Sequence, residues 1–301
     1  MDLTSTTVTG CALAVCWGFE SMLPAMRPGP MLSRARARHL ALGMLNIIPW
    51  LAMVWAMVQV GRIPVLRDAG LLRLIDLPQW AQFVAVLLLL DFWQYACHII
   101  MHRVPILWRL HAVHHNADLY EATTSFRFHT LEVTIQNGAM MVLLLVSGIG
   151  LDGLMVYNLL LTPVSIIHHA NLRLPTHLDR ILGTVLVTPG MHRVHHSRWQ
   201  PETDSNYSAV FSIWDRLFRT LRSSADPYAI EPGLDGYQPH EVHTLTGMLA
   251  SPFGQSRSQP GSPPKPGHRR SLHPDASSAP SGCTSATQVH KNPKDKFVDF
   301  M

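Results

Sequence analysis

Residues 40–60 read LALGMLNIIPWLAMVWAMVQV, a run of 21 positions without a charged side chain. A helix needs about 20 apolar residues to cross the hydrocarbon core of a bilayer. The run therefore predicts a membrane-spanning helix, in which Pro49 is tolerated and predicts a kink. The alternative is a large soluble helical protein that buries the same residues, and the length and purity of the run argue against it.

Other apolar runs repeat this signal. Residues 80–101 contain only one acid and one histidine. Residues 133–170 are apolar except where glycines and an aspartate interrupt them at 148–153, which predicts a helical hairpin. Residues 3–26 are a weaker candidate because they include Glu20. No stretch alternates apolar and polar residues over the length of a strand. We therefore expect an all-α integral membrane bundle with about four or five membrane helices.

Charge is distributed unevenly along the chain. The net charge of +4 arises in residues 251–301, because residues 1–250 hold seventeen arginines, no lysine and seventeen acids. A basic balance of this origin does not indicate nucleic-acid binding. Residues 251–301 are rich in serine and proline and too poor in apolar side chains to form a core, which predicts a disordered tail. The four cysteines form neither a CxxC motif nor a disulfide framework.

Histidines are concentrated between residues 98 and 196, where twelve of the eighteen lie. The spacing is HxxxH at 98–102, HxxHH at 111–115 and HxxHH again at 192–196. Residues three and four apart share one face of a helix, so each motif directs two or three imidazoles to one place. Neutral imidazole is a common ligand for zinc, copper, iron and nickel. The alternatives, a pH-sensing cluster or ordinary surface histidines, predict looser spacing.

The number of histidines indicates more than one metal ion. Up to ten imidazoles exceed the roughly four to six ligands that one such ion takes, so the sequence predicts a dimetal site. Buried imidazoles without partners cost about 1–3 kcal/mol each, and metal coordination satisfies them. The histidines outside the clusters are expected not to be ligands: His39, His177, His240, His243, His268, His273 and His290.

Four polar residues are candidates for orienting the ligands. Asp91 and Tyr95 lie on the same helix face as the HxxxH motif, and an acid inside a membrane helix usually has a function. Glu132 follows the single histidine of RFHTLE by three residues, and Asn171 follows the HH doublet by two. Such groups can hold the second ring nitrogen of a ligand imidazole. The alternative for Asp91 is a hydrogen bond between helices.

These motifs, in this order, resemble the fatty acid hydroxylase superfamily, which includes the sterol desaturases. The matching elements are Asp91-x-x-x-Tyr95-x-x-His98-x-x-x-His102-Arg103, LWRLHAVHH, RFHTLE, HHANLRLP, TPGMHRVHHS and TDSNYSAVFSIWDRLFRTL. They extend from about residue 80 to residue 221. The resemblance implies a centre of two iron ions, or zinc in the purified protein, held in a histidine-rich cap on the cytoplasmic side of a membrane bundle.

The resemblance also assigns the metal ligands. In the family a histidine usually stands directly before Ser or Ala and Asn, which favours His169, with His168 as the alternative. The implied ligands are His98, His102, His111, His114, His115, His129, His169, His192, His195 and His196.

The implied activity is O2-dependent hydroxylation or desaturation of an unactivated C–H bond in a sterol, fatty acyl or related membrane lipid. Reduction of O2 to water takes four electrons, two of which come from outside the substrate. The sequence has no flavin, haem or iron–sulfur motif, so we expect a separate donor, either a reductase, a ferredoxin or a cytochrome. A zinc-dependent membrane lipid hydrolase would need a glutamate base within the motif, as in HExxH. A histidine-rich metal transport or binding protein would place its ligands along a transmembrane path.

The sequence also predicts segments and orientation. Arginines between the first two apolar runs place that loop in the cytoplasm, and the HxxxH motif then ends a span on the same side. No basic segment precedes the first apolar stretch, so no cleaved signal peptide is expected. The arginine-rich, lysine-free body suggests a GC-rich bacterial genome and an inner membrane. The expected segments are N-terminal membrane helices at 1–79, a catalytic domain at 80–221, an extension at 222–250 and the tail at 251–301.

Overall fold

The computed structural model of the chain describes residues 3–27, 29–67 and 69–254. These residues form helices and loops, and within them β-pairing is limited to three isolated bridges, which confirms the all-α prediction. From residue 255 onward the predicted tail lies outside the described residues, as do His268, His273 and His290. The long helices are α1 Leu3–Met22, α2 Leu32–Leu45, α3 Ile47–Gly61, α5 Gln79–Arg103, α6 Pro105–His115, α7 Thr130–Ser147 and α8 Leu151–His169.

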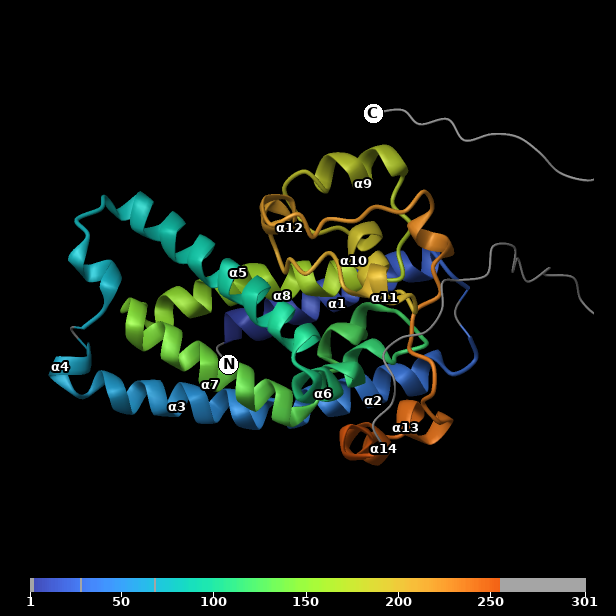
Figure 1. The fold of residues 1–301 in the computed structure, drawn as a ribbon, viewed down its shortest axis with the longest axis horizontal. Helices are drawn as coiled ribbons and strands as arrows, with labels where there is room; N and C mark the ends of the chain where they lie inside the picture. Colours follow the sequence, from blue (N-terminus) through green and yellow to red (C-terminus); the bar gives the residue numbers. More distant parts are fainter. Residues whose placement is uncertain (1–2, 28, 68, 255–301) are drawn as a thin grey trace, which may run out of the picture. The chain divides into compact units, whose positions relative to one another are not determined.

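The remaining helices are short. The α-helical ones are α4 Pro64–Arg67, α9 Thr176–Leu182, α10 Pro189–His195, α11 Gln200–Thr203, α12 Ile213–Leu217, α13 Pro239–His243 and α14 Leu245–Ala250. The 3₁₀ turns are η1 Leu71–Leu74, η2 Ala122–Phe126, η3 Pro227–Ala229 and η4 Ser251–Phe253. Figure 1 shows α4 at one end of the long helices and the short helices α9–α14 toward the other. We call α6, η2 and residues 170–254 the cap.

Four segments are long and apolar enough to cross a membrane: α2 with α3, α5, α7 and α8. Only 17–22% of each apolar window is buried inside the protein. Large side chains such as Trp55, Val142 and Val146 point outward, where lipid would cover them. The prediction of about four or five membrane helices is therefore confirmed, and α1 is not among the four.

The first of these segments is interrupted at Asn46, which separates α2 from α3. Pro49 has no N–H to donate to the carbonyl of Leu45, so the helix breaks one turn before the proline. Asn46 Nδ2 donates to the Phe128 carbonyl at 2.8 Å and fixes the interruption against the segment between η2 and α7. The predicted kink is thus a short break with a tertiary partner.

The predicted hairpin is formed by α7 and α8. Gly148 ends α7 with a φ of 77°, a left-handed conformation that favours glycine. The two helices pack with α3 and α5 around a core of Met53, Leu90, Leu144 and Tyr157. This core holds the ends of α5 and α8 that carry histidines next to the cap.

Candidate metal centre

A sharp turn between α5 and α6 brings two histidine motifs together. Val104 is extended, with φ −94° and ψ 114°, and Pro105 is the first residue of α6. A residue before proline avoids the helical conformation, whereas proline itself fits the first helical position. The chain therefore turns between HxxxH and HxxHH. The rings of His98 and His111 lie 5.0 Å apart, and those of His102 and His115 4.8 Å.

The second HxxHH motif lies on α10, whose start is fixed locally. Thr188 Oγ1 accepts a hydrogen bond from the Met191 amide at 3.3 Å, and Pro189 occupies the first turn. Ala170 is extended and ends α8 directly after its histidine doublet, and both rings of the doublet lie against His192 of α10. The rings of His169 and His192 lie 4.4 Å apart. The rings of His98 on α5 and His195 on α10, which are 97 residues apart in sequence, lie 4.5 Å apart.

Nine histidines form two adjacent groups, each with its donor nitrogens within 4.8 Å of one another. Each HxxHH motif contributes to both groups, because positions i and i+4 share one helix face and i+3 lies beside it. The His115 and His196 rings stack 4.5 Å apart and join the groups. The first group is His98, His102, His111, His115 and His195, and the second is His114, His169, His192 and His196.

The first group presents ring nitrogens that have no hydrogen-bond partner. The Nε2 atom of each of its five histidines is buried and unpaired within the described residues. In most of them the other nitrogen is held: His98 Nδ1 donates to the Tyr207 carbonyl at 2.8 Å, and His195 Nδ1 to the Ser205 carbonyl at 2.7 Å. A ring that donates through Nδ1 offers its Nε2 lone pair to a cation. These residues therefore fit a bound metal ion.

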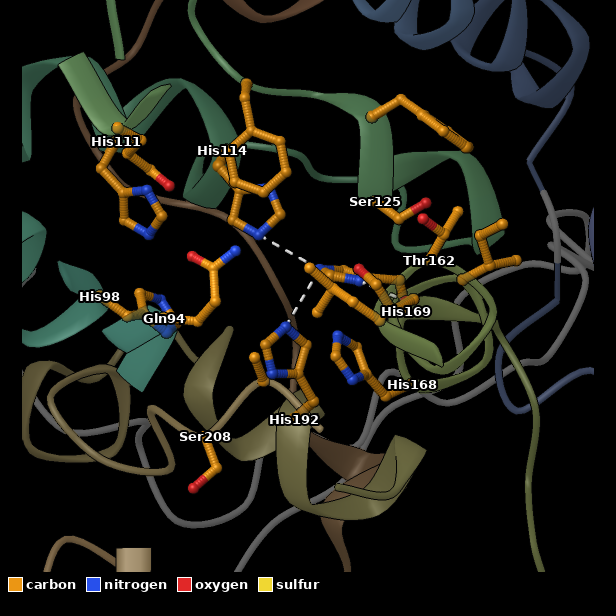
Figure 2. Close-up of a pocket in the computed structure, with 17 residues that line it drawn as sticks. Gln94, His98, His111, His114, Ser125, Thr162, His168, His169, His192 and Ser208 are labelled. Carbon is orange, nitrogen blue, oxygen red and sulfur yellow. Dashed lines mark hydrogen bonds between the residues drawn. The ribbon is translucent and has the colours of Figure 1, made fainter. Parts of the chain in front are cut away.

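The second group has the spacing of ligands around one ion. His169 Nε2 lies 3.1 Å from His114 Nε2 and 3.0 Å from His192 Nε2, as the dashed lines in Figure 2 show. Neighbouring nitrogens at right angles around a metal, each at about 2.1 Å, are separated by about 3.0 Å. His169 Nδ1 points to the Ser165 carbonyl at 2.8 Å. This group also fits a metal ion.

Burial keeps the cap histidines neutral. It lowers the pKa of His114, His115, His192, His195 and His196 well below the usual 6.5, and neighbouring imidazoles lower it further. Neutral imidazole is the form that binds metal. At neutral pH the cluster therefore needs no deprotonation before it accepts an ion.

The same pKa shifts predict a pH dependence for metal-free protein. The unfolded chain takes up protons on these histidines near pH 6.5, whereas the folded protein does not until the pH is much lower. The unfolded state then binds more protons, so the free energy of unfolding falls as the pH decreases below about 6.5. Thermal unfolding of chelator-treated protein from pH 7.5 to 5 measures this loss. A melting temperature that rises on acidification would contradict the burial of neutral histidines.

Two candidate ligands of the sequence analysis, His129 and His168, lie outside the groups. His129 caps the start of α7, where its Nδ1 accepts from the Leu131 amide at 3.1 Å and its Nε2 lies 3.1 Å from the Leu249 carbonyl. His168 lies beside the second group, with its ring 4.0 Å from that of His192. The structure thus places His169 within a group, His168 next to it and His129 apart.

Glu132 is the orienting candidate that reaches a ligand. Its Oε1 atom lies 2.6 Å from His111 Nδ1 and also accepts from Gln136 Nε2 at 2.9 Å. Both Glu132 and His111 are buried. A carboxylate in this position holds the imidazole orientation and raises its basicity.

Replacing Glu132 by alanine is expected to weaken metal affinity about 10–100-fold, because His111 loses the partner that orients its ring. Competition with a chelator of known affinity measures the change. Glu132→Gln, which can still accept through its amide oxygen, is expected to retain more affinity than Glu132→Ala. Equal affinity in all three proteins would show that the contact does not act on the metal ligand.

The other three orienting candidates contact no histidine ring nitrogen in any hydrogen bond of the described residues. Tyr95 Oη pairs with Thr220 Oγ1 at 2.9 Å, and Asn171 exchanges two hydrogen bonds with the Met26 backbone. Asp91 lies between helices, as its alternative interpretation proposed. It accepts from the Tyr157 hydroxyl, the Trp214 indole and the backbone N–H groups of Val210 and Phe211.

Comparison with known proteins identifies a family domain in the part of the chain that carries both histidine groups. Residues 83–220 match the family model described as fatty acid hydroxylase. Residues 83–220 form a fatty acid hydroxylase domain. The family resemblance read from the motifs is therefore confirmed.

Relatives of this fatty acid hydroxylase domain are named as lipid-modifying enzymes. Ornithine lipid hydroxylase OlsE of Rhizobium tropici is 26% identical over 178 residues, which are 59% of this chain and 52% of the relative. Alkylglycerol monooxygenase of Caenorhabditis elegans is 29% identical over 50% of this chain and 29% of the relative. Sphinganine C4-monooxygenase 1 of Arabidopsis thaliana is 29% identical over 52% and 58%. The chain thus spans about half or less of the length of most of these relatives, and no solved structure matches it.

A cavity of about 260 Å³ opens beside the histidines of the fatty acid hydroxylase domain. Five residues of the two groups line it, together with apolar side chains such as Leu161 and Ile166. Uncharged polar residues complete the wall, and Figure 2 shows Gln94 projecting into the same space as the histidines. The lining residues include no Asp, Glu, Lys or Arg. A largely apolar molecule with uncharged polar groups fits this lining.

The sequence analysis did not identify residues 204–207, which contact the Nδ1 atoms of three candidate ligands. Asp204 Oδ1 lies 3.3 Å from His102 Nδ1, and the carbonyls of Ser205 and Tyr207 hold two further rings. Asp215 fixes the segment by accepting from the amides of Tyr207 and Ser208 at 2.8 and 3.0 Å. The motif TDSNYSAV was noted only for its resemblance, because backbone carbonyls leave no side-chain signal.

Proposed function

We propose that this chain is an O2-dependent membrane lipid hydroxylase with two iron ions held by nine histidines. The observation that carries the proposal is the pair of adjacent histidine groups. Within each group the buried donor nitrogens lie within 4.8 Å of one another. The iron centre would activate O2 for attack on a C–H bond. The protein residues hold the ions, orient the imidazoles and exclude water from the reacting carbon.

The relatives support hydroxylation rather than desaturation. Those described above are named as hydroxylases or monooxygenases, and their named substrates are an ornithine lipid, an alkylglycerol and sphinganine. These molecules share an apolar chain next to an uncharged polar linkage or hydroxyl group. In the proposed complex, Gln94 donates a hydrogen bond to such a group while the apolar lining holds the chain.

The electron balance requires a partner. Hydroxylation consumes O2, two electrons and two protons, and it yields the alcohol and water. The C–H bond supplies the other two electrons of the four that reduce O2. We therefore propose an external donor, either a reductase, a ferredoxin or a cytochrome, that docks on the cap. We also propose that the cap lies on the cytoplasmic side of a bacterial inner membrane. The positive-inside rule supports this side, because Arg27 precedes α2 and Arg34, Arg36 and Arg38 lie in its first half.

Lipid hydrolysis with zinc is the runner-up function. It would need a carboxylate free to activate water beside the metal. Within the described residues, Glu132 reaches the first group through His111 and Asp204 reaches it through His102. Each of the two acids is already engaged by its histidine and by a glutamine, Gln136 for Glu132 and Gln200 for Asp204. This arrangement favours an orienting role over a base, and therefore the oxygenase.

The test combines metal analysis with an isotope. Protein purified in detergent is analysed for metal, supplied with a membrane lipid extract, a reducing system and oxygen-18 gas, and the lipids are examined by mass spectrometry. We expect about two iron ions per chain, as two groups require, and one oxygen-18 atom in the product. Lipid cleavage without isotope incorporation would favour hydrolysis. No product after iron reconstitution would overturn the proposed function.

A further inference from the structure

A second cavity lies between the membrane helices. Its volume is about 280 Å³, and apolar side chains of α1, α3, α7 and α8 form much of its wall. Its lining residues include no charged side chain. The apolar lining residues on the four helices include Val8, Trp50, Val133, Met155 and Leu159.

The two cavities share one wall. Ser125, Phe126, Phe128 and Thr162 line both of them. The Phe128 ring stacks on His114, with centroids 4.3 Å apart and an interplanar angle of 10°. Phe128 thus lines the second cavity and also contacts a member of the second histidine group.

The shared wall is positioned by the interrupted first segment. Asn46 donates to the Phe128 carbonyl at 2.8 Å. Gly43 lies against Phe126, since a Cβ added to the glycine would come within 2.9 Å of the phenylalanine Cβ. The backbone of α2 can approach the wall this closely only because residue 43 has no side chain. The N-terminal helices therefore set the position of both phenylalanines.

The second cavity extends away from the histidines along α8. Thr162 lies seven residues before His169, and Met155 lies seven residues before Thr162. At about 1.5 Å per residue, the cavity continues for about 10 Å along the axis of a membrane helix. Together the two cavities fall within the roughly 300–1,000 Å³ typical of ligand sites. A long apolar space that begins at the metal groups and enters the membrane suits a hydrocarbon chain.

The helix that closes the second cavity is fixed to the domain at its far end. Glu20 Oε1 accepts from the backbone amides of Ala122 and Asn171, both at 2.8 Å. Glu20 also pairs with Arg36 at 2.6 Å. These buried contacts hold α1 against η2 and the end of α8. The contribution of α1 to the cavity wall is therefore fixed by specific buried contacts.

We propose that the second cavity binds the hydrocarbon chain of the lipid, so that α1, α3 and the segment joining α2 to α3 select chain length. These helices lie outside the matched range 83–220. The bound chain crosses the shared wall beside Phe126 and Phe128 to bring the reacting carbon to the histidine groups. That the bound lipid is also the substrate rests on the proposed function.

Photolabelling of metal-free protein in detergent tests the site without turnover. The probe is a phosphatidylglycerol with a diazirine in the middle of one acyl chain. Two substitutions fill the cavity, Val8→Trp on α1 and Met155→Trp on α8. Two matched controls place the same ring on the outer face of the same helices, Val15→Trp, where the valine is 55% exposed, and Val156→Trp, where it is 42% exposed.

We expect label on peptides of α1 and α8 in the wild type and in both controls. In the filled variants it should fall at least about fivefold, because the indole occupies the space of the chain. Met155→Ala enlarges the cavity instead of filling it, and it therefore still tests the site if a filled variant does not fold. It should shift labelling toward probes with a longer chain. Equal labelling of filled and control variants, or an unchanged chain preference in Met155→Ala, overturns the proposal. Labelling needs neither metal nor O2, so a failed hydroxylase assay with this pattern intact rejects the activity and leaves the site.

Discussion

Replacing His115 by alanine is expected to release metal and to lower lipid hydroxylation by more than about 100-fold. Its ring lies 4.6 Å from His195 of the first group and 4.5 Å from His196 of the second, and both of its nitrogens lack a hydrogen-bond partner. Loss of a residue that merely orients a ligand already costs about 10–100-fold, so loss of a ligand itself costs more. Metal content per chain and product formation are the measurements.

The matched control is His129→Ala. His129 caps α7 and lies apart from both groups, so we expect this variant to keep its metal content and activity. Its free energy of unfolding should fall by about 1 kcal/mol, the typical value of a lost helix cap. If His129→Ala loses metal as His115→Ala does, His129 belongs to the ligand set and our grouping is incorrect.

Replacing Asp91 by alanine is expected to prevent accumulation of folded protein. The carboxylate accepts four hydrogen bonds in a fully buried position. Each buried donor left without a partner costs about 1–3 kcal/mol, and a typical protein is stable by only about 5–15 kcal/mol. The substitution also frees the segment at 210–214, which follows the carbonyls that hold His98 and His195.

Thermal unfolding and protease resistance in detergent measure this effect. Asp152→Ala is the control, because Asp152 is an exposed acid in the first turn of α8 and its loss should cost less than about 1 kcal/mol. An Asp91→Ala protein that folds normally but has lost metal would instead support the orienting role inferred from the sequence.

The membrane helices were predictable because an apolar run of about 20 residues has few physical solutions. The interruption at Asn46 was signalled only through Pro49, one turn away. The break itself depends on the Phe128 carbonyl, 82 residues later in the chain, and no local pattern reports such a partner.

The candidate ligands were predictable as clusters but not as groups. HxxHH spacing shows that three rings lie close together, yet the division of each motif between two groups depends on the turn at Val104 and on the position of α10. His129 has the same residue type in a family-like motif, although the structure uses it as a helix cap. Asp91 attracted a functional interpretation because acids are costly in membranes, and its hydrogen-bond partners lie 66 to 123 residues away in the chain.

The distribution of the ligands also sets an order of assembly. Both groups draw on α10, since the first needs His195 and the second needs His192 and His196. The four membrane segments all precede α10 in the chain. During synthesis, therefore, neither ion can find its full set of ligands until the last hydrophobic segment has left the ribosome. Metal capture would then be a late event in biogenesis, and an ion bound earlier would be held only by the incomplete sets of histidines on α5, α6 and α8.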